Sequence, residues 1–394
     1  MEKIKGQEKL HPWMGFVLFG IVMCSFLLFG VWMQQNLGIP GLILTEVMFL
    51  GIAIIYCLIT HVDLREVFHF KKINVRDFFG SMFMLAGGFL LSIISVGLVG
   101  SLLPSSMTEA AELSDFLYGS MGYIPTILIV AVLPAICEEA IHRGAIIANF
   151  RSLKRDWVIV LIMGLLFGIF HLSILRFLAT AILGACLSYV VVKKNNLLLS
   201  MIMHFTNNLV SATMGYLTSG TDATASLATT DMTQVLGAYL VIGFAAPILL
   251  TIGMLLIDPK SHRKIRFLYA GILSGAMLIA GIAINVANMS APIVSSTGTY
   301  MFASENEEML GETFNVEEGK TYSIVAVVTG GDGDYYLRIE GPDGKDVLPK
   351  TEYSGSIAKT ISAQVELKEG TYTTYLSGSS GSSDQMPTFQ LVIR

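Results

Sequence analysis

Charged residues are scarce in this chain, and its longest apolar runs contain none. Only 14% of the 394 residues are Asp, Glu, Lys or Arg, and 53% are hydrophobic, whereas a soluble protein has about 25% charged residues. Met14–Met33, Phe78–Leu103 and Val235–Ile257 carry no charge. Each is long enough to cross a hydrocarbon layer about 30 Å thick. The composition excludes an ordinary soluble protein and predicts an integral membrane protein.

Cysteine is also rare, and the polar C-terminal part has none. The four cysteines, which are Cys24, Cys57, Cys137 and Cys186, all fall in apolar segments. Disulfides are therefore not expected to hold the polar part together. The first apolar run lacks a small-residue cleavage site and is long enough to span, so we expect a retained helix and no cleavable signal peptide.

The apolar runs predict an all-α polytopic bundle of about nine transmembrane helices. The predicted spans are Trp13–Met33, Ile39–Ile59, Phe78–Leu103, Ile124–Phe150, Val158–Ser173, Phe177–Val192, Leu197–Leu217, Val235–Ile257 and Phe267–Asn288. With the N-terminus inside, sixteen Lys and Arg residues lie on the inner side, and only Arg176 lies in the short outer loops. The positive-inside rule then predicts a cytoplasmic N-terminus and an extracytoplasmic C-terminus, as in a bacterial cell membrane.

The chain changes character after residue 290. Residues 291–394 contain 15 acidic and 7 basic residues and no apolar run that could span. Strand-like stretches alternate with turn signals such as Gly331–Asp332–Gly333 and Pro342–Asp343–Gly344. The predicted strands are Thr321–Val328, Tyr335–Glu340, Ile361–Leu367, Tyr372–Leu376 and Thr388–Ile393. We expect a transmembrane domain over 1–290 and a small all-β sandwich over 291–394.

Several ionisable residues lie inside predicted spans, where each charge costs about 2.5–3.5 kcal/mol and needs a reason. Glu139 and Arg143 are four residues apart, so they can pair along one helix face, while Glu138 points elsewhere. His204 and Asn208 also share a face. Gly164 and Gly168 lie on the face of His171 and allow a neighbouring backbone to approach closely. Glu46 stands alone in the second span, and we expect it to be a packing residue.

Three motifs in successive spans carry a resemblance to a known family. They are Glu138-Glu139-x-x-x-Arg143, Phe167-x-x-x-His171 and His204-x-x-x-Asn208. In this order they resemble the motifs of the CPBP family, which comprises CAAX-prenyl endopeptidases and bacteriocin-processing relatives. The resemblance covers about 124–215, the expected peptidase core. It does not extend to the additional spans or to the outer β domain.

The resemblance implies an intramembrane endopeptidase that acts on a membrane-associated, CAAX-type or prenylated substrate. Glu138 would activate water, with His171 orienting it, and His204 and Asn208 would stabilise the oxyanion. Glu139 and Arg143 would form a structural ion pair, with Phe167 as further support. A zinc version, with Glu138, His171 and His204 as ligands, is equally compatible with these residue types. No cofactor follows from the metal-free version.

Other classes of protein remain as alternatives or are excluded. The spans contain no His-Glu-x-x-His, no Gly-x-Ser-x-Gly and no Asp, which excludes the metalloprotease, rhomboid and presenilin types. A non-catalytic scaffold or immunity protein and an ion-coupled transporter are the alternatives to a peptidase. We expect membrane lipids and a membrane-associated peptide or protein as partners, and no nucleic acid. The outer β domain has three open roles: binding substrate, binding a cell-surface partner, or a non-catalytic exported module.

Overall fold

The computed structural model describes residues 9–103, 106, 116–118, 121–218, 232–261, 264–287, 293–300, 302, 307–317, 319–329, 333–353, 359–378 and 387–394. The chain divides into two compact units, one helical and the other containing the C-terminal strands. The boundary predicted at 290 lies outside the described residues.

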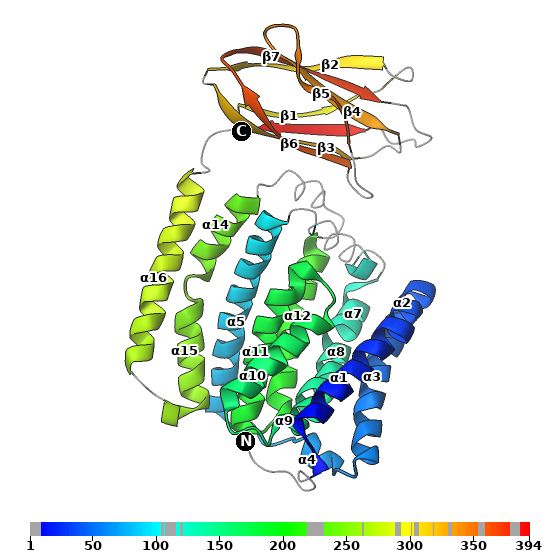
Figure 1. The fold of residues 1–394 in the computed structure, drawn as a ribbon, viewed down its shortest axis with the longest axis vertical. Helices are drawn as coiled ribbons and strands as arrows, with labels where there is room; N and C mark the ends of the chain where they lie inside the picture. Colours follow the sequence, from blue (N-terminus) through cyan, green and yellow to red (C-terminus); the bar gives the residue numbers. More distant parts are fainter. Residues whose placement is uncertain are drawn as a thin grey trace. The chain divides into compact units, whose positions relative to one another are not determined.

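Long helices make up the first unit (Figure 1). Three short segments are π-turns and one is a 3-10 turn, and all four are labelled η. In chain order the elements are α1 (Pro12–Ser25), η2 (Phe26–Gly30), α2 (Val31–Leu37), α3 (Ile39–Ile59), α4 (Leu64–Val67), α5 (Val75–Leu102), α7 (Tyr123–Thr126), η3 (Ile127–Val132), α8 (Leu133–Glu139), η4 (Ala140–Ile146), α9 (Ile147–Phe150), α10 (Asp156–Phe170), α11 (Ile174–Lys194), α12 (Leu197–Thr218), α14 (Met232–Gly243), α15 (Ala246–Ile257), the 3-10 turn η5 (Pro259–Ser261) and α16 (Lys264–Ala287).

The described helices confirm a polytopic membrane bundle. Seven of them are long and apolar enough to cross a membrane. Every predicted span is helical. Two of them are not among the seven helices that meet this criterion: the fifth span, which is the 15-residue helix α10, and the seventh span, which is α12. The helix α10 ends at Phe170, before the predicted end at Ser173, because Leu172 adopts a left-handed conformation with a φ of 50°. This early end places His171 directly after the helix.

Helices α10 and α11 pack closely through glycines of α10. A Cβ atom added to Gly164 would lie 2.8 Å from the carbonyl oxygen of Ala181, and one added to Gly168 would lie 2.8 Å from that of Phe177. The close approach predicted from these glycines is therefore present.

Replacing Gly164 with alanine should loosen this packing. The new methyl group would meet backbone atoms of α11, which cannot rotate away, and overpacking of this kind costs about 1–3 kcal/mol. We expect a lower midpoint of thermal unfolding in detergent. Gly275→Ala in α16 is the matched control, because nothing lies within 4 Å of its added Cβ. Equal midpoints for the two variants would contradict the close packing.

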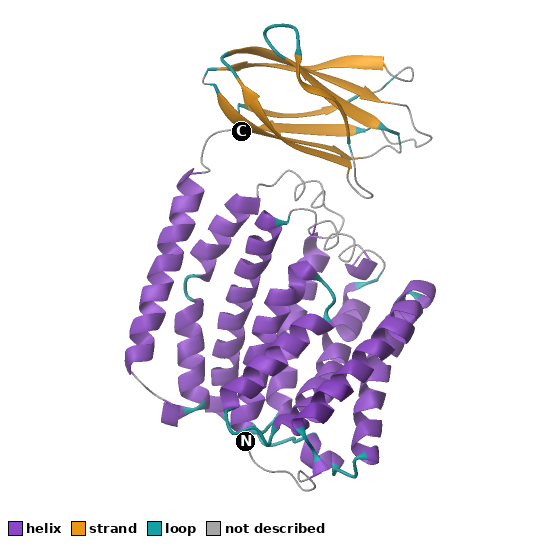
Figure 2. Cartoon of the chain, viewed as in Figure 1, coloured by secondary structure: helices purple, strands orange, loops and turns teal. Residues whose placement is uncertain are grey.

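Two antiparallel sheets form the C-terminal unit (Figure 2). One sheet has the order β1 (Val294–Thr299), β8 (Thr388–Ile393), β3 (Lys320–Thr329) and β6 (Lys359–Leu367). The other has the order β2 (Glu307–Val316), β7 (Gly370–Gly378), β4 (Tyr335–Glu340) and β5 (Asp346–Glu352). Buried side chains of both sheets, such as Ile324 and Leu337, belong to one apolar core. The prediction of a small all-β domain is confirmed.

The five predicted strands are present, and β1, β2 and β5 are additional. Of the two predicted turns, the one at Pro342–Asp343–Gly344 is present, with Gly344 at a φ of 71°. The turn at Gly331–Asp332–Gly333 falls mostly outside the described residues. No disulfide links the sheets, since all four cysteines of the chain are free.

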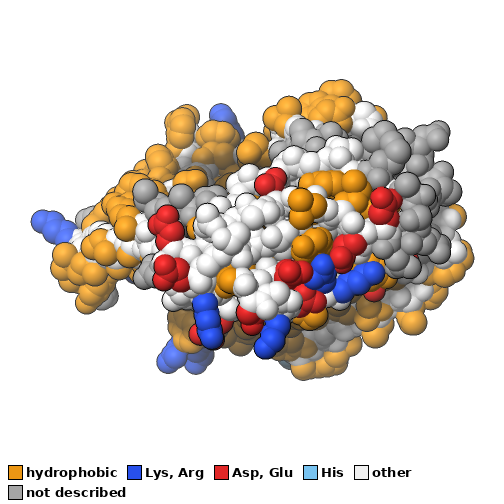
Figure 3. Space-filling view, turned by 90° about the horizontal axis from the view of Figure 1, so that it is seen from above, with side chains coloured by type: hydrophobic (Ala, Val, Ile, Leu, Met, Phe, Trp, Pro, Cys, Tyr) orange, Lys and Arg blue, Asp and Glu red, His pale blue; other side chains and the backbone are white. Residues whose placement is uncertain are grey.

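Charged side chains of both signs lie next to one another on the face seen in Figure 3. In the C-terminal unit Arg338 pairs with Glu308, Glu340 and Asp346 at 2.8 to 3.1 Å. Hydrogen bonds from Arg338 hold the pKa of the Glu308 carboxyl below its usual range. This network joins β2, β4 and β5 on the surface of one sheet.

Candidate active site

The two adjacent glutamates lie in a helix interrupted by π-turns. The π-turns η3 and η4 flank the short helix α8, which ends at Glu139 and has Pro134 in its first turn. Proline cannot donate the usual backbone hydrogen bond, which fits the irregular turn before it. Because π-turns widen a helix locally and are frequent at functional sites, this segment is a plausible place for a reactive carboxylate.

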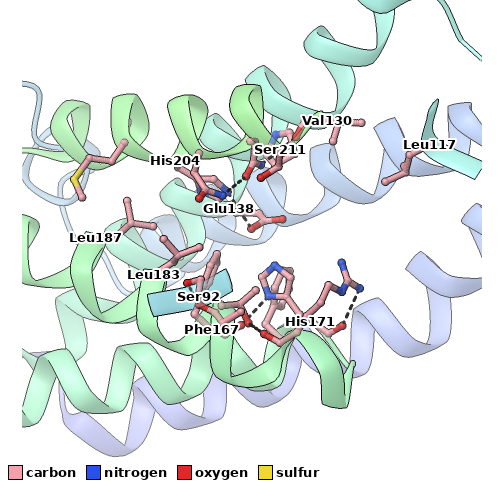
Figure 4. Close-up of a pocket in the computed structure, with 18 of the residues that line it drawn as sticks. Ser92, Leu117, Val130, Glu138, Phe167, His171, Leu183, Leu187, His204 and Ser211 are labelled. Carbon is pink, nitrogen blue, oxygen red and sulfur yellow. Dashed lines mark hydrogen bonds and ion pairs between the residues drawn. The ribbon is translucent and has the colours of Figure 1, made fainter. Parts of the chain in front are cut away.

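Glu138 faces a cavity of about 520 Å³ inside the helical unit (Figure 4). Most of the wall is apolar. The predicted site residues in its lining come from separate elements: Glu138 from α8, His171 from the end of α10, and His204 and Asn208 from α12. Figure 4 shows Glu138, His171 and His204 turned toward the same space. The structure thus brings together the four side chains that the sequence predicts as catalytic.

His171 is held in one orientation by its own helix. Its Nδ1 lies 2.8 Å from the carbonyl oxygen of Phe167, so Nδ1 carries the hydrogen and donates it. In the neutral ring Nε2 is then a hydrogen-bond acceptor. The guanidinium of Arg176 donates to the carbonyl oxygen of His171 at 3.4 Å and helps to fix the turn.

His204 lies between the two glutamates. Its Nδ1 donates to Oε1 of Glu139 at 2.9 Å, and its Nε2 lies 3.9 Å from Oε2 of Glu138. Oε2 of Glu138 is buried without a hydrogen-bond partner among the described residues. Through its hydrogen bond with His204, Glu139 orients that ring, and it also pairs with Arg143. The contact between Glu139 and His204 was not predicted from the sequence.

The fully buried Arg143 links three elements. It donates to Oε1 of Glu139 at 2.8 Å, to the carbonyl oxygen of Gly184 at 3.1 Å and to Oγ of Ser188 at 3.3 Å. Its guanidinium also lies 4.2 Å from the centre of the Phe167 ring. The ion pair expected between Glu139 and Arg143 is thus present, and it also fastens η4 to α11.

Phe167 separates and supports the two imidazoles. Its ring packs edge-on against His171 at 4.8 Å and against His204 at 5.8 Å between ring centres. Because Arg143 lies on the same ring, one aromatic side chain connects the ion pair with both histidines.

Asn208 is oriented by its neighbours. Its Nδ2 donates to the carbonyl oxygen of Val130 at 3.1 Å, and its Oδ1 accepts from Nδ2 of Asn207 at 3.0 Å. One of the two Nδ2 hydrogens remains available to a ligand. Asn207 also lines the cavity and was not predicted as a site residue.

Residues 120–210 match the family described as type II CAAX prenyl endopeptidase Rce1-like. The matched segment contains all three predicted motifs. The chain has a CPBP-family core.

No curated protein matches the chain. Among solved structures, a carbohydrate binding module (CBM6cm-2) from Cellvibrio mixtus lichenase 5A, in complex with cellotriose, is similar at 15% identity over 26% of this chain and 89% of that chain. Its TM-score of 0.17 supports no conclusion about this protein.

Glu46 reaches the CPBP core from outside it. This residue of α3 is only 6% exposed, lines the same cavity, and its carboxyl lies close enough to that of Glu138 to interact with it. The expectation of an isolated packing residue was wrong. Helix packing brings the two carboxyls together, and no local pattern around Glu46 indicates it.

The described residues of the CPBP core do not fit a zinc site. No group of three His, Cys, Asp or Glu side chains among them is arranged to hold a metal ion. Nδ1 of His204 donates to Glu139 and Nδ1 of His171 donates to a backbone carbonyl, so only Nε2 of each ring is left for a ligand. The set predicted for zinc, which was Glu138, His171 and His204, is therefore not a metal-holding group among the described residues.

Proposed function

We propose that this membrane protein is an intramembrane endopeptidase that hydrolyses a peptide bond of a membrane-associated substrate. The observation that carries the proposal is the arrangement of one carboxylate and two imidazoles, from three helical segments, around a single cavity. The name of the matched family makes a CAAX-type peptide, with or without a prenyl group, the first substrate to try.

In the proposed reaction Glu138 is the general base. A water molecule between Glu138 and His171 gives a proton to Glu138, while Nε2 of His171 accepts its second hydrogen and orients it. The water oxygen forms a bond to the scissile carbonyl carbon, and a tetrahedral oxyanion results. Glu138 then passes its proton to the amide nitrogen as the carbon–nitrogen bond breaks.

His204 and Asn208 would stabilise the oxyanion. Since Nδ1–H of His204 donates to Glu139, Nε2 can donate to the oxyanion only when the ring carries a second proton. The Glu139 carboxylate fixes the orientation of the His204 ring, as the carboxylate of a catalytic triad does. The second amide hydrogen of Asn208 adds a neutral donor.

The orientation in the membrane is part of the proposal. The sixteen basic residues assigned to the inner side favour a cytoplasmic N-terminus and an extracytoplasmic C-terminal unit in a bacterial cell membrane. In that position the β domain could bind the substrate or a cell-surface partner.

The direct test is cleavage by the purified protein in lipid vesicles. We expect it to cut a membrane-anchored peptide with a CAAX-type end, and comparison of prenylated with unmodified peptide would identify the substrate class. If no candidate peptide is cut, chain termini of membrane proteins should be compared between cells with the wild type and cells with Glu138→Ala. Identical termini would favour a scaffold, and cavity-dependent ion flux would favour a transporter.

Removal of metal should leave cleavage unchanged. The described side chains around the cavity hold no three-ligand metal group, and the proposed base is a carboxylate. The measurement is the initial rate after dialysis against a chelator, with and without added zinc. A lost rate that zinc restores would overturn the metal-free mechanism.

A further inference from the structure

A second carboxyl lies beside the proposed general base. Glu46 belongs to α3, outside the matched residues 120–210, and Glu138 belongs to α8. Both residues are buried and line the cavity. The two carboxyls are close enough to interact, and in each of them Oε2 is buried without a hydrogen-bond partner among the described residues.

Two adjacent carboxylates cannot both be charged in such surroundings. Like charges in contact repel strongly where water is excluded, so a pair of carboxyls retains one proton and behaves as a unit. A hydrogen bond between them requires that proton, because an ionised carboxylate can only accept.

The charges around the pair indicate where the proton resides. His204, Arg143, Arg176 and Glu139 act on Glu138, and three of these four groups can be cationic. Glu46 makes no ion pair in the described part of the chain, and the Cys137 thiol is also near it. Glu138 is thus the better site for the negative charge, and Glu46 is the better site for the proton.

We propose that Glu46 is a positioning residue that, in its protonated form, donates a hydrogen bond to Glu138 and holds its carboxylate toward the cavity. This inference rests on the proposed function of Glu138. Without the donor, the Glu138 carboxylate would have an unsatisfied oxygen and could turn away from the water that it is to deprotonate.

Two substitutions of Glu46 separate hydrogen bonding from packing. Glu46→Gln keeps a donor, whereas Glu46→Leu fills similar space without one. Since a hydrogen bond to a charged group contributes enough to change a rate by about 10- to 100-fold, we expect Glu46→Leu to lower kcat by that factor with an unchanged KM. Glu46→Gln should retain most of kcat. Equal kcat values for the wild type and Glu46→Leu, with equal thermal stability, would overturn the proposal.

Infrared spectroscopy tests the proton directly and needs no activity. A protonated carboxyl has a carbonyl stretch that ionised carboxylates lack, and it shifts in heavy water. At neutral pH the wild type should show this band, and Glu46→Gln should lose it. Glu66→Gln, in the short helix α4, is the control that should keep it. A band that persists in Glu46→Gln would refute a proton on Glu46, even if the wild type proved not to be a peptidase.

Discussion

Replacing Glu138 with glutamine should abolish cleavage while the protein still folds. The carboxylate is the proposed acceptor of the water proton, and general base catalysis typically contributes about 10²- to 10⁴-fold to a rate. Glutamine has the same shape but cannot take up a proton at neutral pH. Because the substitution also removes a buried charge, thermal stability should be unchanged or higher. The measurement is kcat for the membrane-anchored peptide, together with the midpoint of thermal unfolding.

Two comparisons make this result specific. His171→Ala should also abolish cleavage, since His171 is the proposed second contact of the water. Glu66→Gln removes a carboxylate from α4, away from the cavity lining, and should cleave at the wild-type rate. Full turnover by Glu138→Gln would end its assignment as the base, and the carboxyl pair with Glu46 would need another explanation.

Most of the helices were predictable because their apolar runs are long enough to cross a bilayer. For Ile39–Ile59 the predicted bounds are those of α3. The π-turns around α8 were not predictable, because they depend on how neighbouring helices pack. The missed strands have weak patterns: β2 fully buries only Phe314 and Val316 of its ten residues, and β5 contains Pro349.

The site was predictable where residues four apart share a helix face. This spacing predicted the ion pair between Glu139 and Arg143. It also predicted that His204 and Asn208 lie on the same face of one helix, and both line the cavity. The contact between Glu139 and His204 joins two helices, as does that between Glu46 and Glu138. Neither is encoded in local spacing, because both depend on the packing of segments that are distant in the chain.

Replacing Arg143 with alanine should have the largest effect on stability. The guanidinium satisfies Glu139, Ser188 and the carbonyl oxygen of Gly184, and all of these groups are buried. Removing one member of a buried ion pair costs about 3–5 kcal/mol, because the other charge remains without compensation. We expect a fall in the midpoint of thermal unfolding on the order of 10 °C, measured in detergent by intrinsic fluorescence.

The partner substitution shows whether the uncompensated charge is the cause. In the double variant Arg143→Met with Glu139→Gln both charges are absent, and the midpoint should recover part of the loss seen with Arg143→Met alone. Arg143→Lys keeps the charge but cannot reach Glu139, Ser188 and Gly184 together, so its stability should lie between those of the wild type and Arg143→Ala. Cleavage by the double variant should stay low even where its stability recovers, because Glu139 also orients His204. Recovery of both stability and cleavage would mean that the ion pair only supports the fold, and that His204 does not need Glu139 to act.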